Sequence, residues 1–490
     1  MSKFNWGKRA YAVCLLCATT AVTLPAQTFT TLHSFDNTDG LRADAALVQG
    51  TDGNLYGTTN EGGANGGGTV FKITASGTLT TLYSFCSQTS CTDGAYPVAA
   101  LVQAADGNFY GTTAGGGANG QGTVFKITHN GTLTTLYNFC SQSGCMDGEE
   151  PTAALVQATN GNFYGTTQSG GVINSTCPFG CGTVFKITHS GMLTTLYSFC
   201  SQNPCADGAY PTTALVQATD GNFYGTTYEV ANGYGTVFEI APGGKLTTLH
   251  SFDGTDGGGP VGLVQATDGN FYGTTEALGP NGLGTVFKMI PSGELTTLYS
   301  FCSQSACADG ALPYAGLVQA TDENFYGTTQ YGGATNNPCP NESVPGCGTI
   351  FKISASGTLT TLYSFCSQSG CADGRISSAG LVQDTNGTFY GTTQSGGASY
   401  DGTIFSLSVG LGPFVETQPT SGRVLERVEI LGTDLTGASR VTFNGTPTFF
   451  VVASSSLVTA WVPLFATSGE VKVRTPHGTL SSNVPFRVKQ

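Results

Sequence analysis

Short runs rich in Val, Ile, Thr, Tyr and Phe recur along the chain, and polar turn residues separate them. Four phrases, Leu-Val-Gln, Tyr-Gly-Thr-Thr, Gly-Thr-Val/Ile-Phe and Leu/Phe-Thr-Thr-Leu, each occur seven times. Runs of this length and composition are typical of β-strands. Asp-Gly or Asn-Gly pairs stand between the first two phrases in most copies and suit tight hairpin turns. The pattern therefore predicts units of four antiparallel strands.

The spacing of the phrases predicts how these units assemble. Tyr-Gly-Thr-Thr begins at Tyr56, Tyr110, Tyr164, Tyr224, Tyr272, Tyr326 and Tyr390. Four-stranded repeats of about 50 residues are typical of β-propeller blades. The sequence thus predicts an all-β fold with a seven-bladed β-propeller over residues 27–408. The region opens with a fourth phrase, Phe29–Leu32, and ends with a third phrase, Gly402–Phe405. We expect the N-terminal strand to close the last blade.

Strand order also predicts which loops share a face. In a four-stranded blade, the connections after the second and fourth strands emerge on one side, which we call the loop face. The tight Asp-Gly and Ser-Gly turns emerge on the other. Variable loops held by a rigid scaffold are common binding surfaces, so we expect a ligand at the loop face.

The repeat also resembles a known family. The segment Asp106–Thr113, a Gly-Gly loop and then Gly122–Ile127 resemble the tandem repeat called GloVer, which is found in exported bacterial proteins. The resemblance covers roughly residues 28 to 408. It implies export, and it implies no particular activity.

The repeat stops before residue 412, and residues 412–490 contain no cysteine. Alternating apolar positions there predict sandwich strands at Val428–Gly432, Val441–Gly445, Val458–Pro463 and Glu470–Val473. The order of strands and turn formers is similar to an IPT/TIG immunoglobulin-like module. That resemblance implies a small β-sandwich that serves as a spacer or binds a partner.

The first 26 residues indicate the compartment. Basic residues precede the apolar run Ala10–Val22, and a small-residue motif ends at Ala26. These are the parts of a secretory signal peptide, and the run is shorter than the roughly 20 residues of a membrane span. We predict signal peptide 1–26, a mature chain without a membrane span, and a location outside the cell or in its envelope.

Charge restricts the partners. The formal net charge is −13, with 18 Lys and Arg against 31 Asp and Glu, and no basic run is present. Nucleic-acid binding needs clustered cations that release counterions, so nucleic acid is excluded as a partner.

Fourteen of the 16 cysteines lie beyond the signal peptide. Two repeats, at Ser34–Gly40 and Ser251–Gly257, have lost both cysteines of the C-x4-C loop together, which indicates that the cysteines are bonded in pairs. An exported protein favours disulfides. Zinc needs four converging ligands, whereas we expect each pair in a separate blade, so no metal is predicted. The expected disulfides are Cys86 with Cys91, Cys140 with Cys145, Cys177 with Cys181, Cys200 with Cys205, Cys302 with Cys307, Cys339 with Cys347, and Cys366 with Cys371.

An Asp-Gly pair follows each of these loops, at Asp39, Asp93, Asp147, Asp207, Asp256, Asp309 and Asp373. Such carboxylates either cap their own turn or bind calcium. We favour the cap and predict no cofactor.

A single ligand site should break the sevenfold repetition, so candidate residues are those that differ between copies on the loop face. They are Tyr96, Glu149, Glu150, Tyr210, Tyr228, Tyr234, Tyr314, Tyr331, Arg375 and Tyr400. Tyrosines stack on sugar rings or anchor peptides, and they also simply pack within loops.

These residues predict a non-catalytic binding or scaffold protein for an extracellular polysaccharide or protein. The alternative is a carbohydrate-active enzyme, a glycoside hydrolase or lyase, that uses loop-face carboxylates such as Glu149 and Glu150. No histidine stands at a spacing that pairs it with a nucleophile, so the binding hypothesis is preferred.

Overall fold

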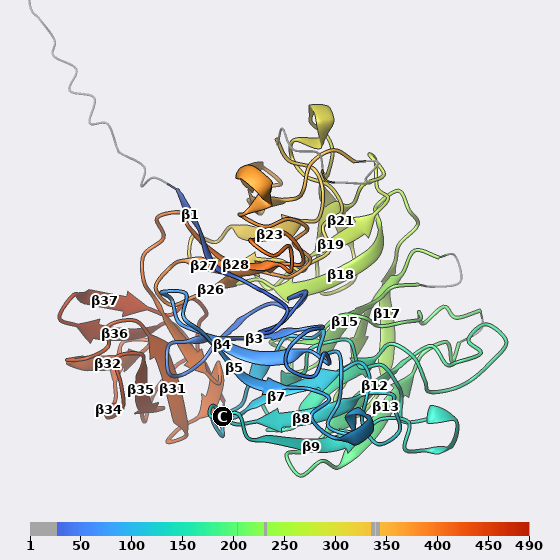
Figure 1. The fold of residues 1–490 in the computed structure, drawn as a ribbon. Coiled ribbons are helices and arrows are strands. Elements are labelled where there is room, and N and C mark those ends of the chain that lie inside the picture. Colours follow the sequence, from blue (N-terminus) through green and yellow to red (C-terminus); the bar gives the residue numbers. More distant parts are fainter. Residues whose placement is uncertain (1–26, 203, 230–232, 335–338, 340–343, 490) are drawn as a thin grey trace, which may run out of the picture.

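The computed structural model describes residues 27–202, 204–229, 233–334, 339 and 344–489, so the predicted signal peptide lies outside the described residues. Strands and turns build this part of the chain, which contains no α-helix (Figure 1). Within it no helix is long and apolar enough to cross a membrane. Four short 3-10 turns occur, at Thr89–Cys91, Ser143–Cys145, Ser305–Cys307 and Ser369–Cys371.

The repeat region forms seven four-stranded antiparallel sheets, numbered here in chain order. Sheet 1 comprises β2 (Val48–Gln49), β3 (Leu55–Thr59), β4 (Thr69–Ile73) and β5 (Leu79–Ser84). Sheets 2 to 4 comprise β6 (Val102–Gln103), β7 (Phe109–Thr113), β8 (Thr123–Ile127), β9 (Leu133–Asn138); β10 (Val156–Gln157), β11 (Phe163–Thr167), β12 (Thr183–Ile187), β13 (Leu193–Ser198); β14 (Val216–Gln217), β15 (Phe223–Thr227), β16 (Thr236–Ile240) and β17 (Leu246–Ser251).

Sheets 5 to 7 follow the same order. They comprise β18 (Gly258–Gln265), β19 (Phe271–Ala277), β20 (Thr285–Met289), β21 (Leu295–Ser300); β22 (Val318–Gln319), β23 (Phe325–Thr329), β24 (Thr349–Ile353), β25 (Leu359–Ser364); and β26 (Val382–Gln383), β27 (Phe389–Thr393), β28 (Thr403–Ser408) with β1 (Thr28–Ser34). Each recurring phrase forms a strand, as predicted.

Strand β1 lies in the seventh sheet, beside β28. The two strands pair antiparallel from Thr28 opposite Ser408 to Ser34 opposite Thr403. The Phe29 ring stacks on Tyr363 of sheet 6, with ring centroids 3.8 Å apart. The first strand of the repeat region therefore contacts its last two sheets, and β1 and β28 are seen side by side in Figure 1.

Aromatic side chains fill the space between neighbouring sheets. Tyr56 of β3 is buried, and its ring lies 4.0 Å from that of Phe109 in sheet 2. Its hydroxyl donates a hydrogen bond to Asp52 at 2.9 Å, which satisfies the only polar group of a buried ring. The same Tyr–Phe contact recurs between other consecutive sheets, for example Tyr224 with Phe271 and Tyr326 with Phe389.

A ladder of glutamines also joins the sheets. The Gln at the end of each innermost strand accepts a hydrogen bond from a backbone N–H of a neighbouring sheet, which pairs polar groups that lie at a packed junction. The donor and acceptor residues are Thr51 and Gln103 (2.9 Å), Ala105 and Gln157 (3.1 Å), Thr159 and Gln217 (2.9 Å), Thr219 and Gln265 (2.8 Å), Thr267 and Gln319 (2.9 Å), Thr321 and Gln383 (3.1 Å), and Thr385 and Gln49 (3.0 Å). The last bond joins sheet 7 to sheet 1.

Residues after 412 form a separate group of strands, seen beside the repeat sheets in Figure 1. Two four-stranded sheets share one apolar core that includes Val428, Val458 and Val473. The strands are β29 (Val415–Gln418), β31 (Arg427–Gly432), β35 (Leu457–Trp461), β34 (Phe450–Val452) in one sheet and β33 (Thr446–Pro447), β32 (Arg440–Phe443), β36 (Val471–Thr475), β37 (Gly478–Ser481) in the other; β30 (Ser421–Arg423) pairs with β38 (Arg487–Lys489).

The C-terminal strands contact the repeat sheets through the tight turns. The backbone N–H of Phe414 donates to the Thr385 carbonyl, and the Ser456 hydroxyl donates to the Thr51 carbonyl, both at 2.9 Å. Both acceptors lie in turns between an innermost strand and the next strand, on the side opposite the loop face. These contacts of the C-terminal strands thus lie on the side of the tight turns.

Candidate functional site

Residues of all seven repeats line a channel of about 440 Å³. Small side chains occupy the innermost positions, which lets the inner strands approach one another: Ala46, Ala100, Ala154, Ala214, Gly262, Gly316 and Gly380. The channel is lined mainly by apolar groups and backbone. Two polar atoms of its lining, Asp44 Oδ1 and the Thr152 hydroxyl oxygen, are buried without a hydrogen-bond partner among the described residues.

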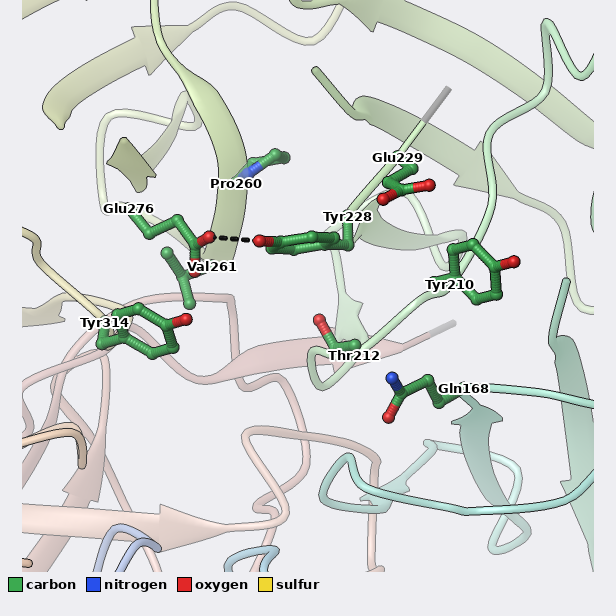
Figure 2. Close-up of a pocket in the computed structure, with 9 residues that line it drawn as sticks. All are labelled: Gln168, Tyr210, Thr212, Tyr228, Glu229, Pro260, Val261, Glu276 and Tyr314. Atoms are coloured by element: carbon green, nitrogen blue, oxygen red, sulfur yellow. Dashed lines mark hydrogen bonds between the residues drawn. The ribbon is translucent and has the colours of Figure 1, made fainter. Parts of the chain in front are cut away.

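A second cavity, of about 500 Å³, lies next to the channel and breaks the sevenfold symmetry (Figure 2). It shares Thr212, Val261 and Tyr314 with the channel lining. A volume of this size suits a small organic ligand or one to two sugar rings. The residues that line it are Gln168, Tyr210, Thr212, Tyr228, Glu229, Pro260, Val261, Glu276 and Tyr314.

Most of the lining comes from two positions of the repeat unit, each of which contributes one residue from three different repeats. Gln168, Tyr228 and Glu276 each directly follow Tyr-Gly-Thr-Thr, in repeats 3, 4 and 5. A backbone bridge recurs beside this position, for example Ala209 with Glu229, so that the equivalent side chains are presented alike. The second position supplies Thr212, Val261 and Tyr314 from three successive repeats. The arrangement of the sheets thus gathers residues that are about 50 positions apart.

Glu276 lies at the centre of the polar contacts. Its side chain extends from β19, is only 8% exposed, and accepts a hydrogen bond from the Tyr228 hydroxyl at 2.6 Å (Figure 2). This bond, together with burial, raises the pKa of Tyr228 to about 12. Burial and the negative charge of Glu276 also raise the pKa of Tyr314. Both phenols therefore remain protonated and act as donors at neutral pH.

The backbone of β18 makes room for this carboxylate. Gly258 pairs with Ala277 and Pro260 with Thr275, which places Gly259 across from Glu276. Gly259 has φ +60°, and a Cβ built there would lie 2.8 Å from the Glu276 Cγ. A glycine is needed at this point because a side chain would displace the carboxylate.

The predicted site residues fall into two groups. Tyr210, Tyr228 and Tyr314 line the cavity. The other seven do not line it. Tyr96 and Tyr400 are exposed, whereas Tyr234 and Tyr331 pack against core clusters. The Glu150 carboxylate accepts a hydrogen bond from Ser169, burial and Glu150 raise the pKa of Glu149, and Arg375 makes a backbone bridge to Ser395.

Glu276, Glu229 and Gln168 are lining residues that were not among the predicted site residues. The position after Tyr-Gly-Thr-Thr carries a usable signal, because it varies among copies while the phrase before it does not. It holds Asn60, Ala114, Gln168, Tyr228, Glu276, Gln330 and Gln394. Only the arrangement of the sheets shows that three of these side chains meet.

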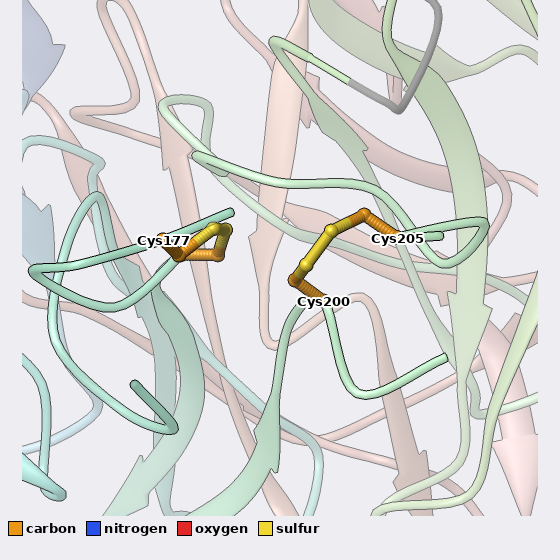
Figure 3. Close-up of side chains that lie close together, drawn as sticks. Cys177, Cys200 and Cys205 are labelled. Carbon is orange, nitrogen blue, oxygen red and sulfur yellow. A yellow bond between two sulfur atoms is a disulfide. The ribbon is translucent and has the colours of Figure 1, made fainter. Parts of the chain in front are cut away.

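All seven expected disulfides are formed, each between the predicted partners. The expectation that each pair lies in a separate blade was wrong for repeats 3 and 6, each of which holds two pairs. Cys177 and Cys181 come from the loop between β11 and β12, and they lie against Cys200 and Cys205, which follow β13 of the same repeat (Figure 3). All four sulfur atoms are within 4.8 Å of one another, and all four residues are buried. The cause is that these two loops are neighbours on the loop face.

Repeat 6 shows a similar arrangement, in which the sulfur atoms of Cys347, Cys366 and Cys371 lie within 4.8 Å of one another. The spacing of four sulfur atoms in repeat 3 would suit a tetrahedral thiolate metal site. The sulfur atoms are instead bonded in pairs, and a disulfide sulfur is not a thiolate ligand.

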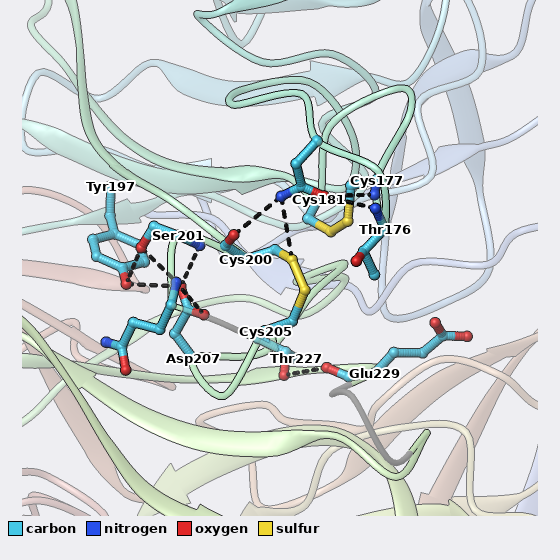
Figure 4. Close-up of a disulfide and its surroundings, with 12 residues drawn as sticks. Thr176, Cys177, Cys181, Tyr197, Cys200, Ser201, Cys205, Asp207, Thr227 and Glu229 are labelled. Atoms are coloured by element: carbon cyan, nitrogen blue, oxygen red, sulfur yellow. Dashed lines mark hydrogen bonds between the residues drawn. A yellow bond between two sulfur atoms is a disulfide. The ribbon is translucent and has the colours of Figure 1, made fainter.

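The cysteine cluster of repeat 3 is connected by backbone hydrogen bonds to a residue that lines the cavity, and Figure 4 shows the cluster with Glu229 nearby. The Cys181 carbonyl accepts a hydrogen bond from the Tyr210 N–H, and the Cys205 carbonyl accepts one from Gly208. On the other side, the Glu229 carbonyl accepts a hydrogen bond from the Thr227 hydroxyl at 3.1 Å. These bonds fix the backbone of two residues that line the cavity.

The Asp-Gly carboxylates cap their own loops, as favoured from the sequence. Asp93 is fully buried and accepts hydrogen bonds from Tyr83 and from the backbone and hydroxyl of Ser87. In the repeats without cysteines, Asp39 and Asp256 contact His33 and His250 at 2.6 and 2.7 Å.

The profile of the Gloeobacter/Verrucomicrobia repeat matches residues 18–177 and 171–405. The chain belongs to this repeat family, as the resemblance indicated. A comparison with curated proteins found no match.

Two solved structures are similar in fold. One is described as the extracellular domain of a one component system from B. thetaiotaomicron; it is 12% identical, with a TM-score of 0.50, and the match covers 95% of this chain and 58% of that one. The chain thus spans about three fifths of that protein domain. The other is a fungal alcohol oxidase of the AA5 family in complex with copper, 13% identical, with a TM-score of 0.52 and coverage of 94% and 99%. At these identities the likeness concerns the fold alone, and it fits a propeller-like repeat fold.

Proposed function

We propose that the protein is an exported, non-catalytic binding protein that recognises an extracellular polysaccharide in the cavity on its loop face. In this proposal, signal peptide 1–26 is removed, residues 27–408 form a closed seven-bladed propeller, and residues 412–490 form an IPT/TIG-like sandwich. The seven sheets and the glutamine ladder support the ring, and the two-sheet core after residue 412 supports the sandwich. Seven disulfides suit an oxidising compartment outside the cytoplasm.

The observation that carries the proposal is the composition of the cavity. Three tyrosine rings, two carboxylates and an amide line one space of about 500 Å³, at positions that differ between the repeats. Tyrosine rings offer flat apolar surfaces to the faces of sugar rings, while carboxylates and amides accept and donate bonds to hydroxyls. The function requires no cofactor, because these groups act by binding alone.

A glycan array with the mature chain tests the proposal. We expect binding to a defined set of glycans, and we expect it to be lost in Tyr228→Ala and in Tyr314→Ala. Tyr96→Ala and Tyr400→Ala are matched controls, since these tyrosines are exposed on the same face but do not line the cavity. Equal loss in the control variants, or capture of a protein partner without any glycan binding, would contradict the proposal.

The two carboxylates of the cavity favour one alternative, a carbohydrate-active enzyme. Glu229 and Glu276 line the same cavity, and paired carboxylates are the usual catalytic groups of glycoside hydrolases. This alternative predicts that a polysaccharide which binds is also cleaved, and that Glu276→Gln or Glu229→Gln abolishes cleavage. Binding without release of reducing ends would rule it out.

A further inference from the structure

We infer that the cavity recognises an ammonium group, so that its preferred ligand is an amino-sugar glycan with free, protonated amines. This inference rests on the proposed function and specifies the ligand class of the same site. The structural basis is the Glu276 carboxylate, held between the tyrosines of repeats 4 and 6.

The Glu276 carboxylate has no cationic partner among the described residues. Glu276 is 8% exposed, and among the described residues it forms no ion pair with a Lys, Arg or His nitrogen within 4.0 Å. Its partners are instead neutral phenols: the Tyr228 hydroxyl donates a hydrogen bond to it, and Tyr314 is close enough for the carboxylate to raise the Tyr314 pKa. A buried carboxylate is costly without a cation or several donors. A cationic ligand would supply the charge that the protein does not.

The charged side chains that line the cavity are all negative. Its nine lining residues include two carboxylates, Glu229 and Glu276, and no basic side chain. The chain also carries a net charge of −13. A concave site lined by one sign of charge concentrates ligands of the opposite sign, and it repels carboxylated or sulfated glycans.

The size and the aromatic lining of the cavity favour an organic cation over a metal ion. A bare metal ion would leave most of the 500 Å³ unfilled, and phenol groups are not the ligands that hard cations prefer. Three tyrosine rings around two carboxylates suit an organic cation, because a ring face attracts an ammonium group. Tyr228 and Tyr314 lie on either side of Glu276, as Figure 2 shows. The arrangement can hold a sugar ring against tyrosine while its amine reaches the carboxylate.

The residues around Glu276 depart from the other repeats at three positions. Glu276 is the only acidic residue at its position in the seven repeats, and Tyr314 is the only aromatic residue at its own position. Gly259, which leaves space for the Glu276 side chain, replaces Arg42, Tyr96, Glu150, Tyr210, Leu312 or Ile376 of the other repeats. Three departures from the repeat therefore coincide at one carboxylate.

The test compares three tetrasaccharides of the same β-1,4-linked backbone by titration calorimetry with the mature chain. The probes are a glucosamine oligomer, an N-acetylglucosamine oligomer and cellotetraose. At mildly acidic pH the first is cationic and the other two are neutral. We expect the glucosamine oligomer to bind at least about tenfold more tightly than either neutral oligomer, and this preference to fall with rising salt.

Glu276→Gln separates charge from shape, because glutamine keeps the acceptor oxygen for Tyr228. We expect it to remove the preference and leave the neutral oligomers as they were. Glu150→Gln removes a carboxylate of the same face outside the cavity and should change nothing. The comparison of the charged and neutral oligomers uses the unmodified protein, so it tests the inference even if Glu276→Gln folds poorly.

Each other outcome has a distinct meaning. Equal binding of the charged and neutral oligomers would overturn the ammonium inference and leave the proposed glycan function standing. Absence of binding by all three oligomers, together with an empty glycan array, would overturn both. Tighter binding of a lysine-bearing peptide than of the glucosamine oligomer would overturn the assignment to an amino sugar.

Discussion

The Gln49 side chain accepts a hydrogen bond from the backbone N–H of Thr385 at 3.0 Å, although the two residues are 336 positions apart in the chain. The same bond recurs between the other neighbouring sheets, so the first and seventh sheets are joined in the same way as the other pairs. Together with the pairing of β1 and β28, it connects the start of the repeat region to its end. Stability should therefore depend on residues near the N-terminus of the mature chain.

Phe29 gives the first prediction. Its ring stacks on Tyr363 and lies 5.3 Å from Phe405, so it packs two sheets together. Phe29→Ala should lower the free energy of unfolding by about 2 kcal/mol, less than for a fully buried ring. Chemical denaturation measures this. Thr30→Ala, at an exposed position of the same strand, is the control. No difference between the two variants would mean that β1 adds little to the fold.

Asp384 gives the second prediction. The other six repeats have Gly or Ala at this position, and burial raises the pKa of Asp384 to about 6. Its charged form is thus disfavoured in the folded state, and stability falls as pH rises from about 4 through 6. Asp384→Asn should raise the free energy of unfolding at pH 8 by up to about 3 kcal/mol and have no such benefit below about pH 4.

The contrasting variant is Asp106→Asn. Burial would raise the pKa of Asp106, but hydrogen bonds from Asn108 and Tyr110 lower it overall. This carboxylate therefore stabilises the folded state above its unfolded pKa, and its replacement should destabilise the protein at neutral pH. Opposite signs for the two variants in denaturation at pH 8 are expected; the same sign would contradict the assigned environments.

Asp93 gives the third prediction. Burial raises its pKa, yet the bonds from Tyr83 and Ser87 outweigh this effect and hold the pKa below its ordinary value. The stability that it contributes is present at neutral pH and is lost as pH falls below about 4. Asp93→Asn should lower the melting temperature at pH 7, and the gap from the unmodified protein should narrow in acid. A constant gap across this range would show that the charge is not involved.

The disulfides give the fourth prediction. Closing so small a loop contributes at most about 2 kcal/mol through the unfolded chain. Cys200 and Cys205 are buried beside a second disulfide, whereas Cys86 and Cys91 are half-buried. Replacing the first pair by serine should therefore lower the melting temperature more than replacing the second. Peptide mapping without reductant provides the control, and bonds between Cys177 or Cys181 and the pair Cys200 and Cys205 would contradict the assigned pairing.

Most of the fold could be predicted from the sequence because each strand repeats nearly unchanged. Seven copies of Tyr-Gly-Thr-Thr average out the uncertainty of a single short run, and the ends of the region indicated that β1 pairs with β28. The cysteine pairs followed from their joint loss in two repeats. The contact between two pairs in repeat 3 did not, since it depends on two loops of different length meeting in space.

The candidate site was predicted only in part, for the same reason. Tyr210, Tyr228 and Tyr314 stood out as tyrosines that break the repeat, but so did Tyr96 and Tyr400, which are exposed and do not line the cavity. Glu276 was missed because a single Glu after Tyr-Gly-Thr-Thr carries no signal until repeats 4, 5 and 6 are side by side. Burial of that carboxylate further depends on Gly259, whose role is visible only in the paired strands.

A crystal structure of the mature chain grown with the glucosamine tetramer tests the cavity most directly. We predict density for the oligosaccharide between Tyr228 and Tyr314, with an amine at hydrogen-bond distance from the Glu276 carboxylate. An empty cavity at a saturating concentration of the oligomer, or the oligomer bound on the face of the tight turns instead, would contradict this assignment.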